Sequence, residues 1–405
     1  MSIETGSPSP AAPSVAEPPR WPARALFEGL GAVVPLWAGY VAAMELLARF
    51  FLRDASCTAQ TRIRAIMGNA PQDLSTLPAF ARWDSTWYIS IAQDGYAPRT
   101  GSGAANASFF PLYGWLTRGL SAVTGLDAWN AAAWLSRLSV LGVLLCLALW
   151  LREREARRDP WPTLLAVLCY PSAYILLAVY AESLFLFFSL AGYTLFSRRR
   201  YGFAALAMFL AGLTRIHVVP MGMGLGLWAL HRLWRREPGA WRAMLPPLAG
   251  AAGIGATLYA CWRSTGDATA YFRHKAAFGV VGEGFGRTVR STRDALTNAH
   301  HNGNLAALHT FTEPLSAILL VLTAGHFAWR RRWAEVGICL VVFLMNAYAG
   351  TLWGLPRYTI VAFPVFVMLG RLHRWPGAFY GAMLLSAVTQ VGVMLNYVNS
   401  QTPAP

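Results

Sequence analysis

The sequence predicts an all-α protein that crosses a membrane many times, and three observations support this prediction. Hydrophobic residues occupy 55% of the 405 positions, whereas charged residues occupy 13%. The mean hydropathy of +0.38 is too apolar for one or two soluble domains. Apolar runs long enough to span a bilayer recur along the chain, and short arginine-rich segments separate them. Together these features indicate a polytopic bundle of about eleven transmembrane helices.

The first 24 residues differ in composition from the rest of the chain. Proline, serine and alanine dominate the segment, so it cannot bury a core, and we expect a disordered tail at 1–24. The segment is not typical of a signal peptide, because the first apolar run begins near Ala25 and is long enough to span a membrane. A single transmembrane domain is expected over 25–400.

Eleven apolar runs come close to the length of a membrane span, about 17 to 25 residues, although several are short. They recur from the end of the tail almost to the C-terminus. The predicted spans are 25–52, 128–151, 161–179, 181–197, 201–217, 218–233, 243–262, 305–329, 334–354, 357–371 and 376–399.

Arginine clusters in the connections predict which side of the membrane each connection occupies. Short cytoplasmic loops carry an excess of arginine and lysine, and with eleven spans every cluster falls on one side. That side is expected to be the cytoplasm, which places the N-terminus there as well. The clusters are Arg20/Arg24, Arg152/Arg154/Arg157/Arg158, Arg198 to Arg200, Arg232/Arg235/Arg236, Arg330 to Arg332 and Arg371/Arg374.

One further apolar segment, SFFPLYGWLTRGLSAVTG at 108–125, does not fit this pattern as a span. If it crossed the membrane, all later arginine clusters would lie outside. Pro111 opens the segment and Arg118 interrupts it, as is typical of an interfacial or re-entrant helix. We therefore expect interfacial helices within the first long external loop, 53–127. The alternative is that 108–125 crosses and another predicted span does not.

The same external loop contains ARWDSTWYISIAQDGY at 81–96, in which an acid lies among large aromatic side chains. If this stretch is helical, i,i+4 spacing places Asp84 beside an aromatic surface. Such a carboxylate can deprotonate an acceptor hydroxyl while the rings pack on sugar faces, so Asp84 is a candidate general base. The alternative is an ordinary surface carboxylate. The aromatic residues are Trp83, Trp87 and Tyr88.

Other candidate binding residues lie at external turns between spans. Glu182, close to Tyr180, would accept hydrogen bonds from sugar hydroxyls or cap the following helix. Arg215, near His217, and Arg357 would hold a phosphate through paired hydrogen bonds, or else extend towards lipid headgroups.

Two further cations belong to the same predicted face. Arg82 would contact the ligand or position the acid two residues later. The second external loop, 263–304, contains GDATAYFRHKAAFG with Lys275, the only lysine of the chain. Two alternative explanations account for this single lysine: it contacts a phosphate, or a codon bias towards arginine has left few lysines in the chain.

Composition also excludes several classes of site. The formal charge of +15 does not indicate nucleic-acid binding, because the arginines occur in short runs between apolar segments rather than on one soluble face. The five cysteines lack the spacing of a metal site, and we assign no metal ligands. The sequence has no phosphate-binding glycine loop and no HExxH motif.

An ordered set of segments between about residues 80 and 370 resembles the PIG-V-like family. This family comprises the second mannosyltransferase of GPI-anchor synthesis and its bacterial relatives, in the GT-C class of glycosyltransferases. No single segment is specific, but the order of the set is. The segments are RWDSTWYISIAQDGY, ASFFPLYGWLTR, YPSAYILLAVYAESLF, LTRIHVV, GDATAYFRHKAAFG and LPRYTIVAFPVF.

The resemblance implies a GT-C bundle that transfers a hexose, mannose in the family, from a polyprenyl-phosphate donor to a glycan or glycolipid acceptor with inversion. Asp84 would be the catalytic acid residue. Arg215, Arg357 and Lys275 would stabilise the departing phosphate, so that no divalent cation is required. The composition is typical of bacteria, so we expect a multi-pass inner-membrane protein with its active site on the non-cytoplasmic face.

Two alternatives make different demands on the sequence. A transporter or flippase of a lipid-linked sugar would distribute polar groups through the spans towards both faces, whereas here they gather outside. A non-catalytic scaffold would require neither the acid nor the arginines.

Overall fold

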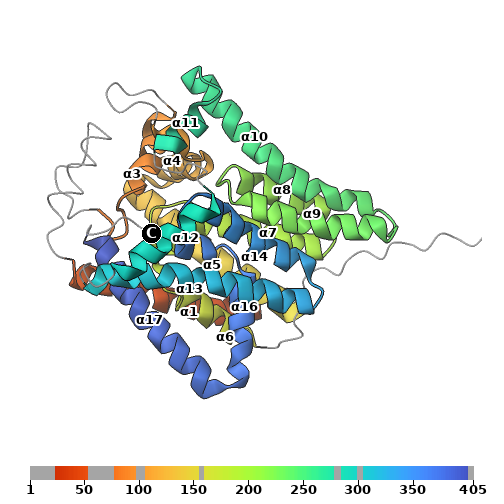
Figure 1. The fold of residues 1–405 in the computed structure, drawn as a ribbon. Coiled ribbons are helices and arrows are strands. Elements are labelled where there is room, and N and C mark those ends of the chain that lie inside the picture. The colour runs from red at the N-terminus through yellow and green to blue at the C-terminus, as the bar shows by residue number, and fades with distance from the viewer. Residues whose placement is uncertain are drawn as a thin grey trace, which may run out of the picture.

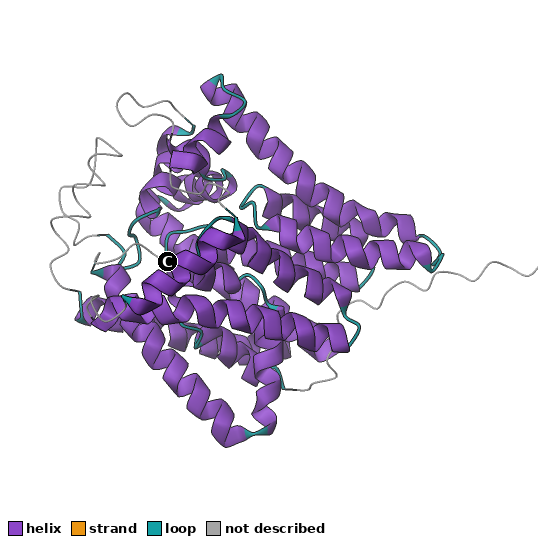
Figure 2. Cartoon of the chain, in the orientation of Figure 1, coloured by secondary structure: helices purple, strands orange, loops and turns teal. Residues whose placement is uncertain are grey.

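The computed structural model describes residues 23–52, 77–96, 105–154, 159–277, 284–298 and 304–399, and these form helices with no strand among them (Figure 2). Most of the expected tail, much of the two external loops, and the side chain of Lys275 lie outside the described residues. The helices are α1 Ala23–Phe50, α3 Ser85–Asp94, η2 Ala105–Ser108, α4 Leu112–Thr124, α5 Ala128–Arg154, α6 Trp161–Leu168, η3 Ala173–Leu177, α7 Glu182–Ser197, α8 Tyr201–Gly212, α9 Val218–Trp234, η4 Ala240–Met244, α10 Leu245–Thr265, α11 Ala270–Ala277, α12 Phe285–Thr297, α13 Asn304–Trp329, α14 Trp333–Tyr348, α15 Leu355–Thr359, α16 Pro364–Gly370, η6 Arg371–Arg374 and α17 Pro376–Val398.

Five helical segments in the described residues are long and apolar enough to cross a membrane. Each of the five coincides with a predicted span to within a few residues at most boundaries. The prediction of an all-helical chain with several membrane-length helices is therefore confirmed. The segments are Glu28–Phe50, Ala128–Glu153, Ala240–Thr265, Thr310–Trp329 and Pro376–Val398.

Two other predicted spans are broken in the structure. The first, 161–179, ends its helix at Leu168, and Pro171 lies in the turn before the next short helix. The second, 357–371, divides between α15 and α16, which begins at Pro364. Proline donates no backbone hydrogen bond and disfavours a helical conformation in the residue before it. Neither segment is therefore the single continuous helix that its hydropathy predicts.

Four further predicted spans are single continuous helices, and two of them, α8 and α14, are each five residues shorter than predicted. α7, α9 and α14 have 16, 17 and 16 residues, and α8 has 12. At 1.5 Å per residue these helices extend about 18 to 26 Å, less than the roughly 30 Å of a bilayer core.

The predicted interfacial helix in 108–125 is α4, which begins directly after Pro111. Its exposed side chains include Trp115 and Val123, which is 86% exposed. Arg118 donates from Nη2 to the carbonyl of Gln93 at 2.9 Å and so ties α4 to the end of α3. A short helix with an apolar exposed side fits the expected interfacial position.

The arginines of the predicted clusters whose side chains the structure describes gather at one end of the bundle. Contacts between helix ends connect them, whereas Glu182 begins α7 at the other end, about 24 Å away along that helix. The side of the membrane that this end occupies stays a prediction. The contacts are Arg152 with Glu28, Arg198 with Glu153, Arg199 and Arg232 with Glu237, Arg332 over the ring of Trp150, and Arg371 with His326.

Glycine allows α8 and α10 to cross at close range, and with α9 they lie side by side in the green part of Figure 1. A Cβ added at Gly212 would lie 2.3 Å from the carbonyl oxygen of Gly250, and one added at Gly253 would lie 2.3 Å from that of Phe209. Small residues at such crossings let apolar helices pack backbone to backbone.

We expect Gly253→Ala to destabilise the protein, because the new methyl group meets backbone atoms that cannot move without separating the helices. The cost should be about 1 to 3 kcal/mol, the usual range for overpacking. Gly255→Ala on the same helix is the matched control, since a Cβ there meets nothing within 4 Å. Thermal unfolding in detergent measures both variants, and equal stability of the two would contradict close packing at this crossing.

Candidate active site

The turn before α3 carries the predicted general base. The structure starts this helix at Ser85, later than the stretch 81–96 predicts, because Trp83 has a φ of +50° and cannot belong to a right-handed helix. Asp84 is therefore the residue that caps the helix, and it does not share one helical surface with Trp83. A bulky residue in this conformation is strained, and such strain persists only where surrounding contacts enforce it.

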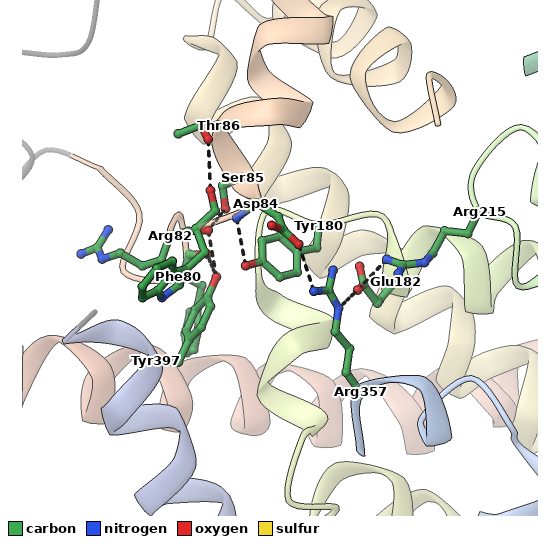
Figure 3. Close-up of polar contacts among 11 residues, drawn as sticks. Phe80, Arg82, Asp84, Ser85, Thr86, Tyr180, Glu182, Arg215, Arg357 and Tyr397 are labelled. Carbon is green, nitrogen blue, oxygen red and sulfur yellow. Dashed lines mark hydrogen bonds and ion pairs between the residues drawn. The ribbon is translucent and has the colours of Figure 1, made fainter. Parts of the chain in front are cut away.

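Contacts from the end of α17 enforce the conformation of this turn (Figure 3). The hydroxyl of Tyr397 contacts the carbonyl oxygens of Phe80 and Arg82 at 3.1 and 3.3 Å. Arg82, only 3% exposed, donates from Nε to the carbonyl of Val398 at 3.2 Å and from Nη1 to that of Ala81 at 3.0 Å. Of the two roles predicted for Arg82, the geometry favours positioning the acid over contacting a ligand.

Four charged side chains form a continuous chain of ion pairs next to this turn (Figure 3). Nη1 of Arg357 donates to Oδ2 of Asp84 at 3.0 Å, and Nε of the same arginine donates to Oε1 of Glu182. Nη1 of Arg215 lies 2.5 Å from that same Oε1 atom. These residues belong to four segments that are far apart in the sequence. We call this group the charge chain.

Exposure differs sharply along the charge chain. The side chain of Glu182 is 1% exposed, and those of Arg357 and Arg215 are 8% and 11% exposed, whereas that of Asp84 is 31% exposed. The other three members pair with one another, since Arg215 and Arg357 both contact the carboxylate of Glu182. Asp84 is thus the most exposed member of the charge chain.

Burial changes the interpretation of three predicted binding residues. Glu182 was expected to accept hydrogen bonds from sugar hydroxyls, but its Oε1 atom is engaged by two arginines inside the protein. Arg215 and Arg357 do not extend towards lipid headgroups, since both turn inwards to Glu182. The cation of Arg357 also lies over the ring of Tyr180, 4.6 Å from its centre.

Tyr180 supports both ends of this arrangement. Its hydroxyl oxygen accepts a hydrogen bond from the backbone N–H of Asp84 at 3.2 Å. Burial raises the pKa of this phenol well above its usual range, so it stays neutral. Tyr180 therefore fixes the backbone of the acid while its ring packs against the arginine that pairs with the acid.

The aromatic residues around Asp84 divide into accessible and buried members. Across residues 77–92, only Trp83, Asp84 and Trp87 are partly exposed, and the others are buried. The ring of Trp87 stacks on Phe109, with ring centres 6.0 Å apart. Trp83 and Trp87 are thus the aromatic residues of this stretch that are partly exposed, as Asp84 is.

Tyr88 and His217 are packing residues in the structure. Tyr88 is 3% exposed and its ring packs edge-on against that of Tyr113, with centres 5.2 Å apart. His217 is 8% exposed and stacks on Tyr358 at 4.4 Å. Their burial gives neither residue the exposure that a direct substrate contact would need.

The second external motif lies partly within the described residues. Arg273 pairs with Asp267, whose pKa is held below its usual range by hydrogen bonds from Thr269 and then by Arg273 itself. Lys275 belongs to α11, but its side chain lies outside the described residues, so its phosphate contact stays a prediction.

Sequence reasoning missed Tyr397. It sits near the end of the last span, where an aromatic residue is ordinary, and only the fold brings it to the turn of Asp84.

No protein-family model matches this chain, and no curated protein matches it either. Within the ranges given above, no group of three or more His, Cys, Asp or Glu side chains could hold a metal ion. The fold and the site define a helical protein with five membrane-length helices and a buried charge chain that ends at a partly exposed carboxylate.

We expect Glu182→Gln to lower the stability of the protein strongly, because it removes the carboxylate that Arg215 pairs with and leaves the buried guanidinium of Arg357 with Asp84 alone. Removing one partner of a buried ion pair costs roughly 3 to 5 kcal/mol. Glu28→Gln is the matched control, since its pair with Arg152 is at the surface, with 51% of the glutamate side chain exposed. Unfolding of both variants in detergent, followed by circular dichroism, provides the comparison. Equal losses of stability in Glu182→Gln and Glu28→Gln would contradict a stabilising role of the charge chain.

Proposed function

We propose that the chain is a membrane glycosyltransferase that moves a hexose, mannose in the first instance, from a polyprenyl-phosphate donor to an acceptor hydroxyl. Asp84 is the general base. The observation that carries this proposal is the accessibility of Asp84 between Trp83 and Trp87, on a turn whose other residues are buried. A sugar needs a carboxylate for its hydroxyl groups and aromatic surfaces for its ring faces, and this turn provides both.

The proposed reaction is a single displacement. The carboxylate of Asp84 takes the proton of the acceptor hydroxyl as its oxygen bonds to the anomeric carbon of the donor sugar. The bond from that carbon to the phosphate oxygen breaks, and polyprenyl phosphate leaves with the electron pair. Attack opposite the leaving group inverts the anomeric configuration. Arg215 and Arg357 supply positive charge beside the reacting groups, so this proposal requires no divalent cation.

The ordered resemblance to PIG-V-like enzymes supports the same class of reaction. We extend the proposal to a GT-C bundle of about eleven segments, in which the short helices and the broken segments complete the crossings. The arginine-rich end would face the cytoplasm and the charge chain would face the other side, in a bacterial inner membrane. The acceptor would be a glycan or a glycolipid.

We expect Asp84→Asn to lower transfer from a polyprenyl-phosphate mannose donor about 100- to 10,000-fold, the usual contribution of a general base. Asparagine keeps the size of the side chain but cannot take the proton. Asp94→Asn is the matched control, because Asp94 is an exposed aspartate at the far end of the same helix. Radiolabel transfer in proteoliposomes measures the activity. Full transfer by Asp84→Asn would overturn the role of this residue.

Transport of a lipid-linked sugar, the rival hypothesis, differs in its access to the site. A transporter exposes its binding site alternately to both sides of the membrane. We expect a cysteine at Asp84, placed in a background without the natural cysteines, to react with a membrane-impermeant maleimide from the non-cytoplasmic side alone. A cysteine at Arg236, at the arginine-rich end, should react from the other side alone. Reaction of the first cysteine from both sides would favour transport.

A further inference from the structure

α12 has three distinct faces, and contacts with the end of α14 hold one of them in place. Thr288 donates from its hydroxyl to the carbonyl of Ala347 at 2.6 Å, and Ser291 donates to that of Gly350 at 3.2 Å. These contacts fasten one side of the helix to the end of α14. Phe285 continues the attachment through its ring, which lies 6.0 Å from that of Tyr348.

The second face is apolar and exposed. Phe285, Val289 and Leu296 are spaced four and seven residues apart, so they follow one side of the helix. They are 49%, 69% and 38% exposed. An exposed apolar stripe of this kind marks a surface that contacts a membrane or another apolar partner.

The third face is cationic. Arg287, Arg290 and Arg293 recur every three residues and are all exposed, whereas Asp294 is the only acid of the helix. Arg293 also contacts Asp294 through an exposed ion pair at 3.1 Å. The helix carries a net charge of +2 from these four residues. Charge and apolarity thus lie on adjacent sides of one helix, as in helices that lie in the surface of a bilayer.

Neighbouring residues indicate where the bilayer surface would be. Phe311, Leu315 and Ile318 form an exposed apolar row along α13, as expected of a helix that faces lipid chains. Tyr348 and Trp353, 56% and 52% exposed, lie at the end of α14 and just beyond it, and aromatic residues of this kind concentrate at the headgroup level. α12 packs against both α13 and α14, so it lies at this level.

We propose that α12 is a binding site for anionic phospholipids: Phe285, Val289 and Leu296 insert among the upper acyl chains while Arg287, Arg290 and Arg293 bind headgroup phosphates. Arginine suits this task because its planar guanidinium donates paired hydrogen bonds to phosphate oxygens. The site depends on the membrane embedding of the bundle and not on the proposed transferase activity. Its attachment to Ala347 and Gly350 places it a few residues before the turn that carries Arg357.

Hydrogen–deuterium exchange of the full chain in lipid nanodiscs tests this proposal. The α12 amides should exchange at least about tenfold more slowly in discs that contain phosphatidylglycerol than in discs of phosphatidylcholine alone, given the attraction of several arginines to an anionic surface. The variant with Arg287→Gln, Arg290→Gln and Arg293→Gln should lose this difference. A variant with Arg235→Gln and Arg236→Gln, two exposed arginines at the other end of the bundle, should keep it.

Two further arms of the experiment distinguish binding of the whole lipid from binding of a free anion. Inorganic phosphate added to phosphatidylcholine discs should leave the exchange of α12 unchanged, because a free anion does not accommodate the apolar stripe. Val289→Glu should speed exchange in both kinds of disc, and unchanged exchange of α5 amides would confirm an intact fold. The proposal is overturned if phosphatidylglycerol has no effect on α12, if the triple variant responds like the original chain, or if phosphate alone reproduces the protection.

Discussion

The charge chain is the constraint on which the rest of the site depends. Each of its buried members would be costly alone, since an isolated charge inside an apolar bundle loses its hydration. The carboxylate of Glu182 compensates the buried charges of Arg215 and Arg357, and the two arginines compensate the buried charge of Glu182. The segments that carry these residues must therefore meet at one point, although Glu182 and Arg357 are 175 positions apart in the sequence. The packing of the helices brings these segments together, and the neutralisation of their buried charges requires the same meeting point.

Within this constraint the two carboxylates have separate tasks. The planar guanidinium of Arg357 donates from Nε to Glu182 and from Nη1 to Asp84, so the buried acid determines where the exposed acid lies. Lysine could not replace this arginine easily, since its single ammonium group lacks the fixed fork. Tyr180 adds a second restraint through the backbone of Asp84. A general base benefits from such restraint, because proton transfer requires hydrogen-bond contact with the reacting hydroxyl.

The sequence predicted the elements whose signal is continuous. α1, α5 and α17 follow uninterrupted apolar runs, and hydropathy located them within a few residues. Hydropathy did not divide 161–179 or 357–371 into separate helices, because it ignores backbone geometry. The sequence does contain a proline in each segment, Pro171 in the first and Pro364 in the second. Asp84, Glu182, Arg215 and Arg357 were expected on one face, and the structure brings them together. Their pairing was not predictable, since the composition of a turn does not reveal which distant turn it contacts.

Positive charge is distributed differently at the two ends of the bundle, and this difference bears on how the proposed polyprenyl-phosphate donor would bind. At the arginine-rich end, residues such as Arg199 and Arg236 remain largely exposed. Near Asp84 the arginines are buried and balanced by carboxylates, so a phosphate there must either share them with Glu182 or use cations nearer the surface. A guanidinium has five N–H donors, and the ion pairs of Arg357 engage only two of its nitrogens. Arg357 could therefore bind a phosphate and keep its observed ion pairs. The phosphate would then lie on the side of Arg357 that Asp84 also occupies.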